Sequence, residues 1–455
     1  MRLPTRAAIK LLRQAILLVS YVGLPFVGSG INLRVGPGVY PQSPREESGS
    51  RQTRENVIHF LTQANDKLKK HDLDGAIEDC NQAIKLDPTY AVTYYVRGEV
   101  KHAKGLQEAA LNDFDDAIRL SPKFAPAYID RAWIKLETFD YDSAVSDCDA
   151  ALRLDPKIAA AYNNRGVAKR ELGEIAGAMN DFNTAIALSS RYALAYRNRG
   201  STELRKNDDH SAIADFNRAI ELNPKDNVAY VVRGQAKLAG DDFNGALADF
   251  SRALELNPKA SNAYVGRGDL ERAKGNLTGA ESEYRQAIQI DPKNASAFLQ
   301  LGIAEENRHG LEEALTAYSR AAELDPPSLR RDYLQFRIWL LRVRLQRGDE
   351  ANHQLTLYLQ GRKQPPLEPW VFKIGNFLLG KSTETDLVES ASASDPDRTQ
   401  EQLCEAWYYA GMKRLLSGDK NRAADAFRHC METNRTRFVE YVLGKSELAS
   451  LQDGG

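Results

Sequence analysis

The sequence has almost no net charge and few of the residues that carry out chemistry. Its 455 residues include 61 basic and 62 acidic side chains, but only 7 histidines and 4 cysteines. This balance gives no electrostatic reason to expect nucleic-acid binding. The histidines lack the spacings of metal ligands, and no nucleophile–base pair, phosphate loop or paired-carboxylate motif occurs. We therefore predict no catalytic residue, no cofactor and no metal ion, and a protein that is not an enzyme.

What the sequence does contain is a repeat of 34 residues. Prolines stand at positions 88, 122, 156, 224, 258, 292 and 326, and Ser190 takes the one missing place. With the proline counted as residue 32 of each unit, eight units begin at residues 57, 91, 125, 159, 193, 227, 261 and 295. A fixed period of this length is typical of a repeat solenoid, in which each unit packs on its neighbours. The chain is thus predicted to present a long surface.

Within the unit, small and large residues recur at helical spacing. Residues 20 and 27 of each unit are always alanine, residue 8 is glycine or alanine, and residue 4 is aromatic. Residue 24 is aromatic in six units, while Cys80 and Cys148 take this place in the other two and are predicted to be buried thiols. The spacings of three and four residues predict two helices that approach closely at the small residues. Gly105, Gly173 and Gly275 are expected to end the first helix in the left-handed conformation.

The segment "AYNNRGVAKRELGEIAGAMNDFNTAIAL", residues 161–188, carries the full pattern and resembles the tetratricopeptide repeat (TPR) family. The resemblance implies an all-α helix-turn-helix solenoid wound as a right-handed superhelix, with eight regular repeats over residues 56–328. It also implies protein–protein interaction, with the first helices of the repeats lining a groove.

Two columns of charge run through these repeats. Residue 7 is arginine in six successive units and residue 23 is acidic in seven. We predict that the arginines and carboxylates pair along the stack, because the guanidinium fork suits buried carboxylates. The alternative is a basic stripe for an anionic ligand.

The ends of the chain differ from the repeats. Residues 1–30 have basic residues, an apolar run and small residues in the order of a signal peptide, while an uncleaved membrane anchor and a cytosolic helix stay open. Residues 31–55 are predicted to be a flexible linker. At the other end we expect a degenerate helical hairpin at 329–362, a linker with short helices at 363–403, and a final hairpin with a capping helix at 404–452.

Cys404 and Cys430 begin and end the two helices of this final hairpin, so they should face each other. They are predicted to form a disulfide in an oxidising compartment, with two unlinked thiols as the alternative. The tail, "QLCEAWYYAGMKRLLSGDKNRAADAFRHC" followed by "FVEY", resembles the ends of bacterial envelope TPR adaptor proteins. That resemblance implies a periplasmic or outward-facing, membrane-attached location.

If residues 2, 5, 6, 9 and 13 of each unit face the groove, as the family implies, the binding surface can be listed. It includes Asn65, Tyr95, Asp130, Trp133, Asn163, Asn164, Arg197, Asn198, Arg205, Gln235 and Asp269. Neighbouring asparagines can hold an extended peptide backbone, because each amide both donates and accepts hydrogen bonds. The alternative is that these residues are merely solvated polar side chains.

The leading hypothesis is a scaffold or adaptor that binds partner proteins or extended peptides in the cell envelope. The second is a cytosolic regulator that binds a peptide or small ligand inside the superhelix.

Overall fold

The computed structural model describes residues 51–206, 208–325, 329–362, 369–392, 396–435 and 439–453. Every regular element in these ranges is an α-helix, and consecutive helices pack as antiparallel pairs. The predicted all-α helix-turn-helix solenoid is therefore confirmed, while its right-handed winding stays a prediction. The signal or anchor segment predicted at 1–30 lies outside the described residues, as does most of the predicted linker. The described chain divides into two compact units, and the boundary along the sequence lies between residues 224 and 225.

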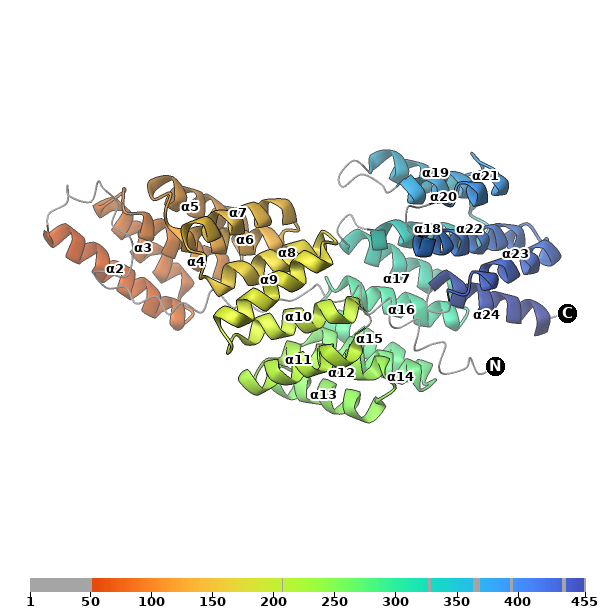
Figure 1. Cartoon of the computed structure of the whole chain (residues 1–455), viewed down its shortest axis with the longest axis horizontal. Coiled ribbons are helices and arrows are strands. Elements are labelled where there is room, and N and C mark those ends of the chain that lie inside the picture. The colour runs from red at the N-terminus through yellow and green to blue at the C-terminus, as the bar shows by residue number, and fades with distance from the viewer. Residues whose placement is uncertain are drawn as a thin grey trace. The chain divides into compact units, whose positions relative to one another are not determined.

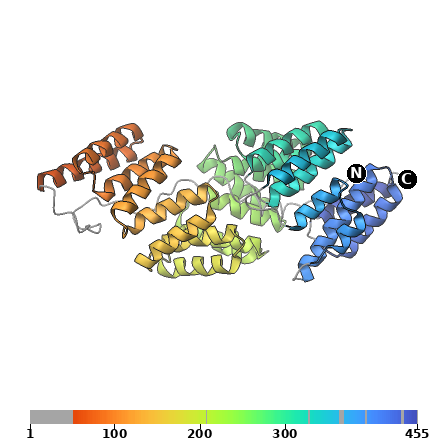
Figure 2. The ribbon, with the colours of Figure 1, turned by 90° about the horizontal axis from the view of Figure 1, so that it is seen from above.

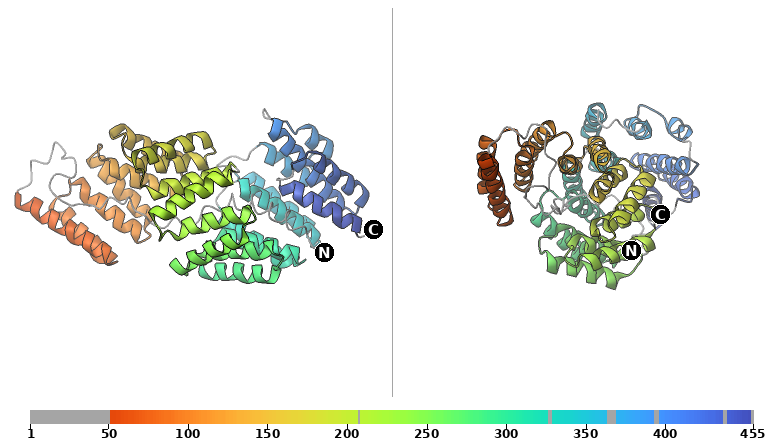
Figure 3. Two further views of the ribbon diagram at one scale, coloured as in Figure 1. Left: turned by 60° about the horizontal axis from the view of Figure 1, so that its bottom comes forward. Right: turned by 60° about the vertical axis from the view of Figure 1, so that its left-hand side comes forward.

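The first unit, residues 51–224, consists of five helix pairs (Figure 1). Each first helix packs on the second helix of its own repeat, and α2, α4, α6 and α8 also contact the first helix of the repeat that follows (Figure 3, left). The first helices are α2 (Arg51–Lys69), α4 (Ala91–Ala103), α6 (Ala125–Glu137), α8 (Ala159–Glu171) and α10 (Ala193–Arg205). The second helices are α3 (Leu73–Leu86), α5 (Gln107–Leu120), α7 (Tyr141–Leu154), α9 (Ile175–Leu188) and α11 (Asp209–Leu222). Because α2 begins at Arg51, the last residues of the predicted linker are helical.

The second unit contains the last three regular repeats and the carboxy-terminal helices. The repeats are formed by α12 (Asn227–Ala239), α13 (Phe243–Leu256), α14 (Ser261–Ala273), α15 (Leu277–Ile290), α16 (Ala295–Asn307) and α17 (Leu311–Leu324). The carboxy-terminal helices, drawn from cyan to blue in Figure 2, are α18 (Leu329–Arg344), α19 (Gly348–Gly361), α20 (Pro369–Leu378), α21 (Glu384–Glu389), α22 (Pro396–Leu416), α23 (Lys420–Glu432) and α24 (Val439–Asp453).

The turns follow from residues read in the sequence. Gly105, Gly173 and Gly275 have φ values of +82°, +84° and +82°, which confirms the left-handed ends of three first helices. The second helices end two residues before the proline position of the repeat, and in several repeats the side chain of the residue in between folds back on the turn. Asp87 Oδ1, for example, accepts a hydrogen bond from the Thr89 backbone N–H at 2.9 Å. Such hydrogen bonds give a partner to a backbone N–H of the tight turn that follows the helix.

The small residues lie where two helices touch. A Cβ atom on Gly166 would lie 2.8 Å from Cε1 of Phe182, closer than real contacts allow, and the other repeats with glycine at residue 8 show the same conflict with the aromatic residue 24. The two repeats with alanine at residue 8 are those with cysteine at residue 24, Ala64 with Cys80 and Ala132 with Cys148. A smaller partner therefore leaves room for the extra methyl group. Both cysteines are fully buried, as predicted, and burial raises the pKa of Cys80 to about 12.

Residues 363–403, predicted to be a linker with short helices, do contain the short helices α20 and α21, but α20 packs into a core. Helix α20 buries Trp370, Val371, Ile374 and Phe377 and contacts α18, α19, α21 and α22, so it belongs to the core of the second unit. Helix α22 begins at Pro396, before the residue predicted for the final hairpin. The polar and proline-rich stretches around α20 suggested a linker, but ten residues with apolar side chains at helical spacing are enough to bind a neighbouring core. Helix α24 covers the final hairpin by packing on α22 and α23.

Candidate functional site: the repeat surface

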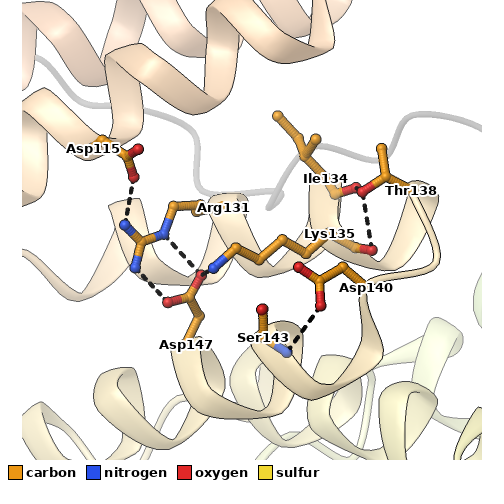
Figure 4. A network of polar contacts seen from close by, with 8 residues as sticks. All are labelled: Asp115, Arg131, Ile134, Lys135, Thr138, Asp140, Ser143 and Asp147. Atoms are coloured by element: carbon orange, nitrogen blue, oxygen red, sulfur yellow. Dashed lines mark hydrogen bonds and ion pairs between the residues drawn. The ribbon is translucent and has the colours of Figure 1, made fainter. Parts of the chain in front are cut away.

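The arginines at residue 7 of each unit are held by carboxylates within the stack. In the third repeat, Arg131 Nε donates to Asp147 Oδ2 at 2.8 Å, and Lys135 Nζ lies 2.7 Å from the same oxygen (Figure 4). The guanidinium also bonds Asp115 of the preceding repeat. Asp147 is buried, with 4% of its surface exposed, so the carboxylate is taken from water in exchange for these bonds.

This arrangement repeats along both units. The bidentate pairs are Arg97–Asp113, Arg131–Asp147, Arg165–Asp181, Arg199–Asp215, Arg233–Asp249 and Arg267–Glu283. Each guanidinium also lies over the tyrosine at residue 4 of its unit, 5.2 to 5.6 Å from the ring centre. The hydrogen bonds that Arg165 donates to Asp181 raise the pKa of Arg165 above its ordinary value. The predicted ladder is confirmed, and its arginines are structural rather than an open stripe for anions.

All but one of the residues predicted to bind a partner are buried on the first helices, each with less than a tenth of its surface exposed. They are Asn65, Tyr95, Asp130, Trp133, Asn163, Asn164, Arg197, Asn198, Gln235 and Asp269, whereas Arg205 is partly buried. Their role in binding stays a prediction. We refer to the side chains at residues 2, 5, 6, 9 and 13 of the first helices as the first-helix face.

Several of these side chains meet across repeats. Tyr95 donates its hydroxyl to Asp130 Oδ2 at 2.6 Å, and Asn198 Nδ2 donates to Asn163 Oδ1 at 2.9 Å. Asn163 Nδ2 in turn donates to Asn164 Oδ1 at 3.2 Å. The cross-repeat partners are 35 residues apart, one repeat plus one residue. The first helices of consecutive repeats thus align with a one-residue offset, which joins their polar side chains into a row.

The other predicted residues have separate surroundings. Trp133 Nε1 donates to Glu137 Oε1 at 3.0 Å within its own helix. Arg205 Nη2 bonds both oxygens of Glu171 from the preceding repeat, at 2.8 and 2.9 Å. Arg197 and Asp130 both face Tyr192, whose pKa burial raises to about 12. Asp269, in the second unit, accepts a 2.8 Å hydrogen bond from Tyr284.

The prediction missed Glu99, which lies on the same face. It occupies residue 9 of its repeat, as Asn65 and Trp133 do, so the positional rule already identifies it. Its Oε1 lies 3.3 Å from the Tyr95 hydroxyl oxygen, while its buried Oε2 has no hydrogen-bond partner. Burial raises the pKa of Glu99 well above its ordinary value, and the nearby Asp130 carboxylate adds to the increase. On the preceding repeat, the buried Nδ2 of Asn65 also lacks a partner.

The sequence profile of the tetratricopeptide repeat matches residues 129–190, 168–227 and 231–295, all within this array. The chain thus contains tetratricopeptide repeats. The TPR region accordingly consists of scaffold repeats of a kind that binds other proteins. In the ranges that the structure describes, no group of His, Cys, Asp or Glu side chains is placed to hold a metal ion, and none of the described helices is both long and apolar enough to cross a bilayer.

Three solved structures resemble this TPR chain in fold. A tetratricopeptide repeat protein from Parabacteroides merdae ATCC 43184 is 20% identical, with a TM-score of 0.46, over 55% of this chain and 99% of the other. PilW, a type IV pilus biogenesis factor, is 15% identical (TM-score 0.42; 47% and 98% of the two chains). YrrB, a TPR protein with an unusual peptide-binding site, is 24% identical (TM-score 0.31; 40% and 95%). These likenesses concern the repeat fold alone.

Cys404 and Cys430 lie together in the last TPR-like hairpin. Their sulfur atoms are 3.1 Å apart and fully buried, so the predicted facing arrangement is confirmed. The structure holds them as two thiols, since a disulfide bond is about 2.05 Å long. The hydrogen bond with Cys404, followed by burial, raises the pKa of the Cys430 thiol. The disulfide itself stays a prediction.

Two buried carboxyl groups join the helices that follow the TPR array. Glu405 on α22 is 2% exposed and accepts a hydrogen bond from Trp370 Nε1 on α20, and Glu440 begins α24 with 8% exposed. Burial raises the pKa of Glu405 to about 8 and that of Glu440 to about 7, and each pKa is also affected by neighbouring charges, including the Glu440 carboxylate beside Glu405. The folded protein therefore keeps protons that an unfolded chain releases near pH 4.5.

We expect the second unit to lose stability as the pH rises from 4.5 towards 8, because the folded pKa values are the higher ones. In Glu405→Gln, which keeps an acceptor for Trp370, this loss should shrink by about 2 kcal/mol. Urea unfolding at pH 5.5 and 8.5, followed by fluorescence of the tryptophans in α18, α20 and α22, measures the difference. The exposed Glu389→Gln is the control, and an equal pH dependence in Glu405→Gln and wild type would refute the assignment.

Proposed function

We propose that this TPR protein is a non-enzymatic scaffold that holds extended segments of partner proteins against its first-helix face. The observation that carries the proposal is a set of buried polar atoms without partners on this face. Asn65 Nδ2 and Glu99 Oε2 stand at residue 9 of consecutive repeats, and Gln300 Nε2 stands at residue 6 of the eighth. Native proteins satisfy nearly all such atoms, and each exception calls for an explanation.

A peptide backbone supplies the missing partners. An amide N–H₂ such as that of Asn65 donates to a peptide carbonyl. The carboxyl group of Glu99, whose raised pKa favours the protonated form, donates its O–H to a peptide carbonyl or, when ionised, accepts from a peptide N–H. Extended segments present both groups at each residue whatever their side chains. The row of amides at Asn163, Asn164 and Asn198 continues the same chemistry along the face, and Trp133 offers an aromatic contact for an apolar side chain.

We further propose that the protein works outside the bacterial cytosol, tethered or released. Support comes from the order of basic, apolar and small residues in 1–30, from the resemblance of the tail to envelope adaptor proteins, and from the contact between Cys404 and Cys430. A disulfide at this contact closes a loop that contributes roughly 3 kcal/mol where the compartment is oxidising.

The binding proposal is tested by replacing the partnerless atoms with apolar ones. We expect Asn65→Leu with Glu99→Leu to keep the fold, because removing unsatisfied buried polar atoms is neutral or stabilising. The full-length double variant and the wild type are each purified from the native cells. The amount of partner protein that co-purifies, measured by quantitative mass spectrometry, should be at least about tenfold lower for the double variant. The matched control is Asn112→Leu with Glu221→Leu, two exposed residues on the second helices α5 and α11. Equal loss in both double variants, or none in the first, would contradict the proposal.

A further inference from the structure

Three consecutive repeats of the first unit expose an apolar side chain at the turn between their two helices. Leu106 is 44% exposed, Phe139 is 42% exposed and Leu172 is 39% exposed. The turns lie at one phase of the repeat, after α4, α6 and α8, and therefore at the same end of the stacked helices. Thr138 and Asp140, which flank Phe139, mark this turn in Figure 4. We refer to the three side chains as the turn patch.

Each residue of the turn patch replaces a polar residue or glycine that other repeats use at the same place. Leu106 stands where Asp72, Asp140, Asp208 and Asp242 cap the second helix, and it makes no capping hydrogen bond. Phe139 stands where three repeats have glycine, and Leu172 stands where four repeats have lysine. Local stability favours the polar residues or glycine, so the folding of these turns does not explain the apolar ones.

At Phe139 the apolar residue is clearly unfavourable for the turn itself. Its φ is +64°, in the left-handed region that bulky residues seldom adopt, whereas Gly105 and Gly173 fill the same place in the repeats on either side. The ring makes an edge contact with Tyr141, with centres 6.4 Å apart, but 42% of the surface of Phe139 stays exposed. A strained residue that keeps a large apolar side chain at the surface points to a function for that side chain.

The three turns are neighbours. Gln107, next to Leu106, donates to Glu137 Oε2 at 3.2 Å, and His102 bonds the same oxygen at 2.7 Å, so the turns of the second and third repeats touch. Helices α6 and α8 are likewise in contact. With about 10 Å between packed helices, the turn patch spans roughly 20 Å, the length of an α-helix of about 13 residues.

The rim of the turn patch is acidic. Glu108, Asp142 and Glu174 are exposed beside the three apolar residues, and none of them takes part in an ion pair of the described chain. The exposed lysine at this edge, Lys104, is bonded to Asp74 of the first repeat. An acidic rim repels anionic lipid and a second acidic copy of itself, and it attracts a cationic partner.

We propose that the turn patch is a second docking surface, separate from the first-helix face, which binds a cationic amphipathic helix of another protein. Apolar side chains of that helix cover Leu106, Phe139 and Leu172, and its lysines or arginines lie against the acidic rim. Binding here leaves the first-helix face available, so the scaffold can hold two partners at once.

The test uses the full chain and a fluorescent amphipathic helical peptide of leucine and lysine, about 14 residues long and roughly 20 Å as a helix. The variant Leu106→Asp/Phe139→Gly/Leu172→Lys restores residues used by other repeats, so it should fold at least as well as wild type. We expect it to bind the peptide at least about tenfold more weakly by fluorescence anisotropy. Leu188→Lys removes an equally exposed leucine, 42% exposed, from the far end of α9 and should bind like wild type.

Equal affinity of the triple variant and wild type would overturn the proposal, as would binding of a peptide with glutamine in place of leucine at wild-type strength. Two further measurements identify other occupants. Self-association that the triple variant loses in sedimentation would assign the turn patch to a second copy of the chain. Flotation with phosphatidylglycerol vesicles that the triple variant loses would assign it to a lipid surface. Either result overturns the proposal of a cationic protein helix.

Discussion

Replacing Asp181 by alanine should destabilise the fourth repeat by about 3 kcal/mol, because it leaves a buried cation without its carboxylate. Asp181 is fully buried and holds Arg165 through two hydrogen bonds, of 2.9 and 2.6 Å, with Lys169 2.9 Å away. Native-state hydrogen exchange of α8 and α9 measures the local free energy of unfolding, which a global melting curve averages in a repeat protein.

The matched control is Asp149→Ala, which removes the third partner of the same guanidinium. Asp149 Oδ1 accepts from Arg165 Nη1 at 2.7 Å, but its side chain is 40% exposed, so we expect a loss of at most about 0.5 kcal/mol. Similar losses in the two variants would mean that the ladder is held no more tightly than a surface ion pair.

Whether Gly166→Ala lowers or raises the free energy of unfolding should depend on the residue at position 182, which packs against it. Gly166→Ala alone should cost about 2 kcal/mol, because its Cβ would meet the Phe182 ring at 2.8 Å. In a Phe182→Cys background the same change should be neutral or stabilising by up to about 1 kcal/mol, since alanine favours the helix and the ring is gone. Phe182→Cys itself should cost about 3 kcal/mol through the cavity it leaves.

Hydrogen exchange of the same two helices in the four proteins of this cycle gives the coupling energy, which we expect to be about 2 kcal/mol. The third repeat is the natural control, because Ala132 already packs on Cys148 there and Ala132→Gly should only weaken it. Additive effects of Gly166→Ala and Phe182→Cys would show that the covariation of residues 8 and 24 has another origin.

The fold could be predicted because the same residue types recur every 34 residues. Their positions within the repeat indicate both where the helices lie and where the helices contact each other. Alanine at residues 20 and 27 and glycine at residue 8 mark the closest approach, and the arginine and acid columns pair within each unit. The short helix α20 was expected from its apolar residues, but its packing could not be predicted from the period, since the helix lies outside the repeats. Its place depends on Trp370 and Ile374 meeting side chains from α18, α19 and α22, which only the tertiary structure brings together.

The first-helix face was predicted as a set of positions, but not as a network. In the 34-residue repeat, Asn163 is residue 5 of its unit and Asn198 is residue 6, so comparing equivalent positions does not pair them. The structure pairs them by a hydrogen bond, because first helices of neighbouring repeats align with an offset of 35 residues. A search for polar pairs 35 residues apart would also have found Tyr95 with Asp130 and His102 with Glu137. The turn patch was missed because each of its residues differs from the pattern at a different position of the repeat.

The central claim, a scaffold that works outside the cytosol, is tested most directly by the intact mass of the chain purified from its native cells without reductant. We predict the loss of about 30 amino-terminal residues, or their retention in a membrane fraction, together with a mass lower by two hydrogen atoms that maps to Cys404 and Cys430. A full-length, soluble chain with four free thiols would contradict the claim, and the same first-helix face would then have to be tested against cytosolic peptides.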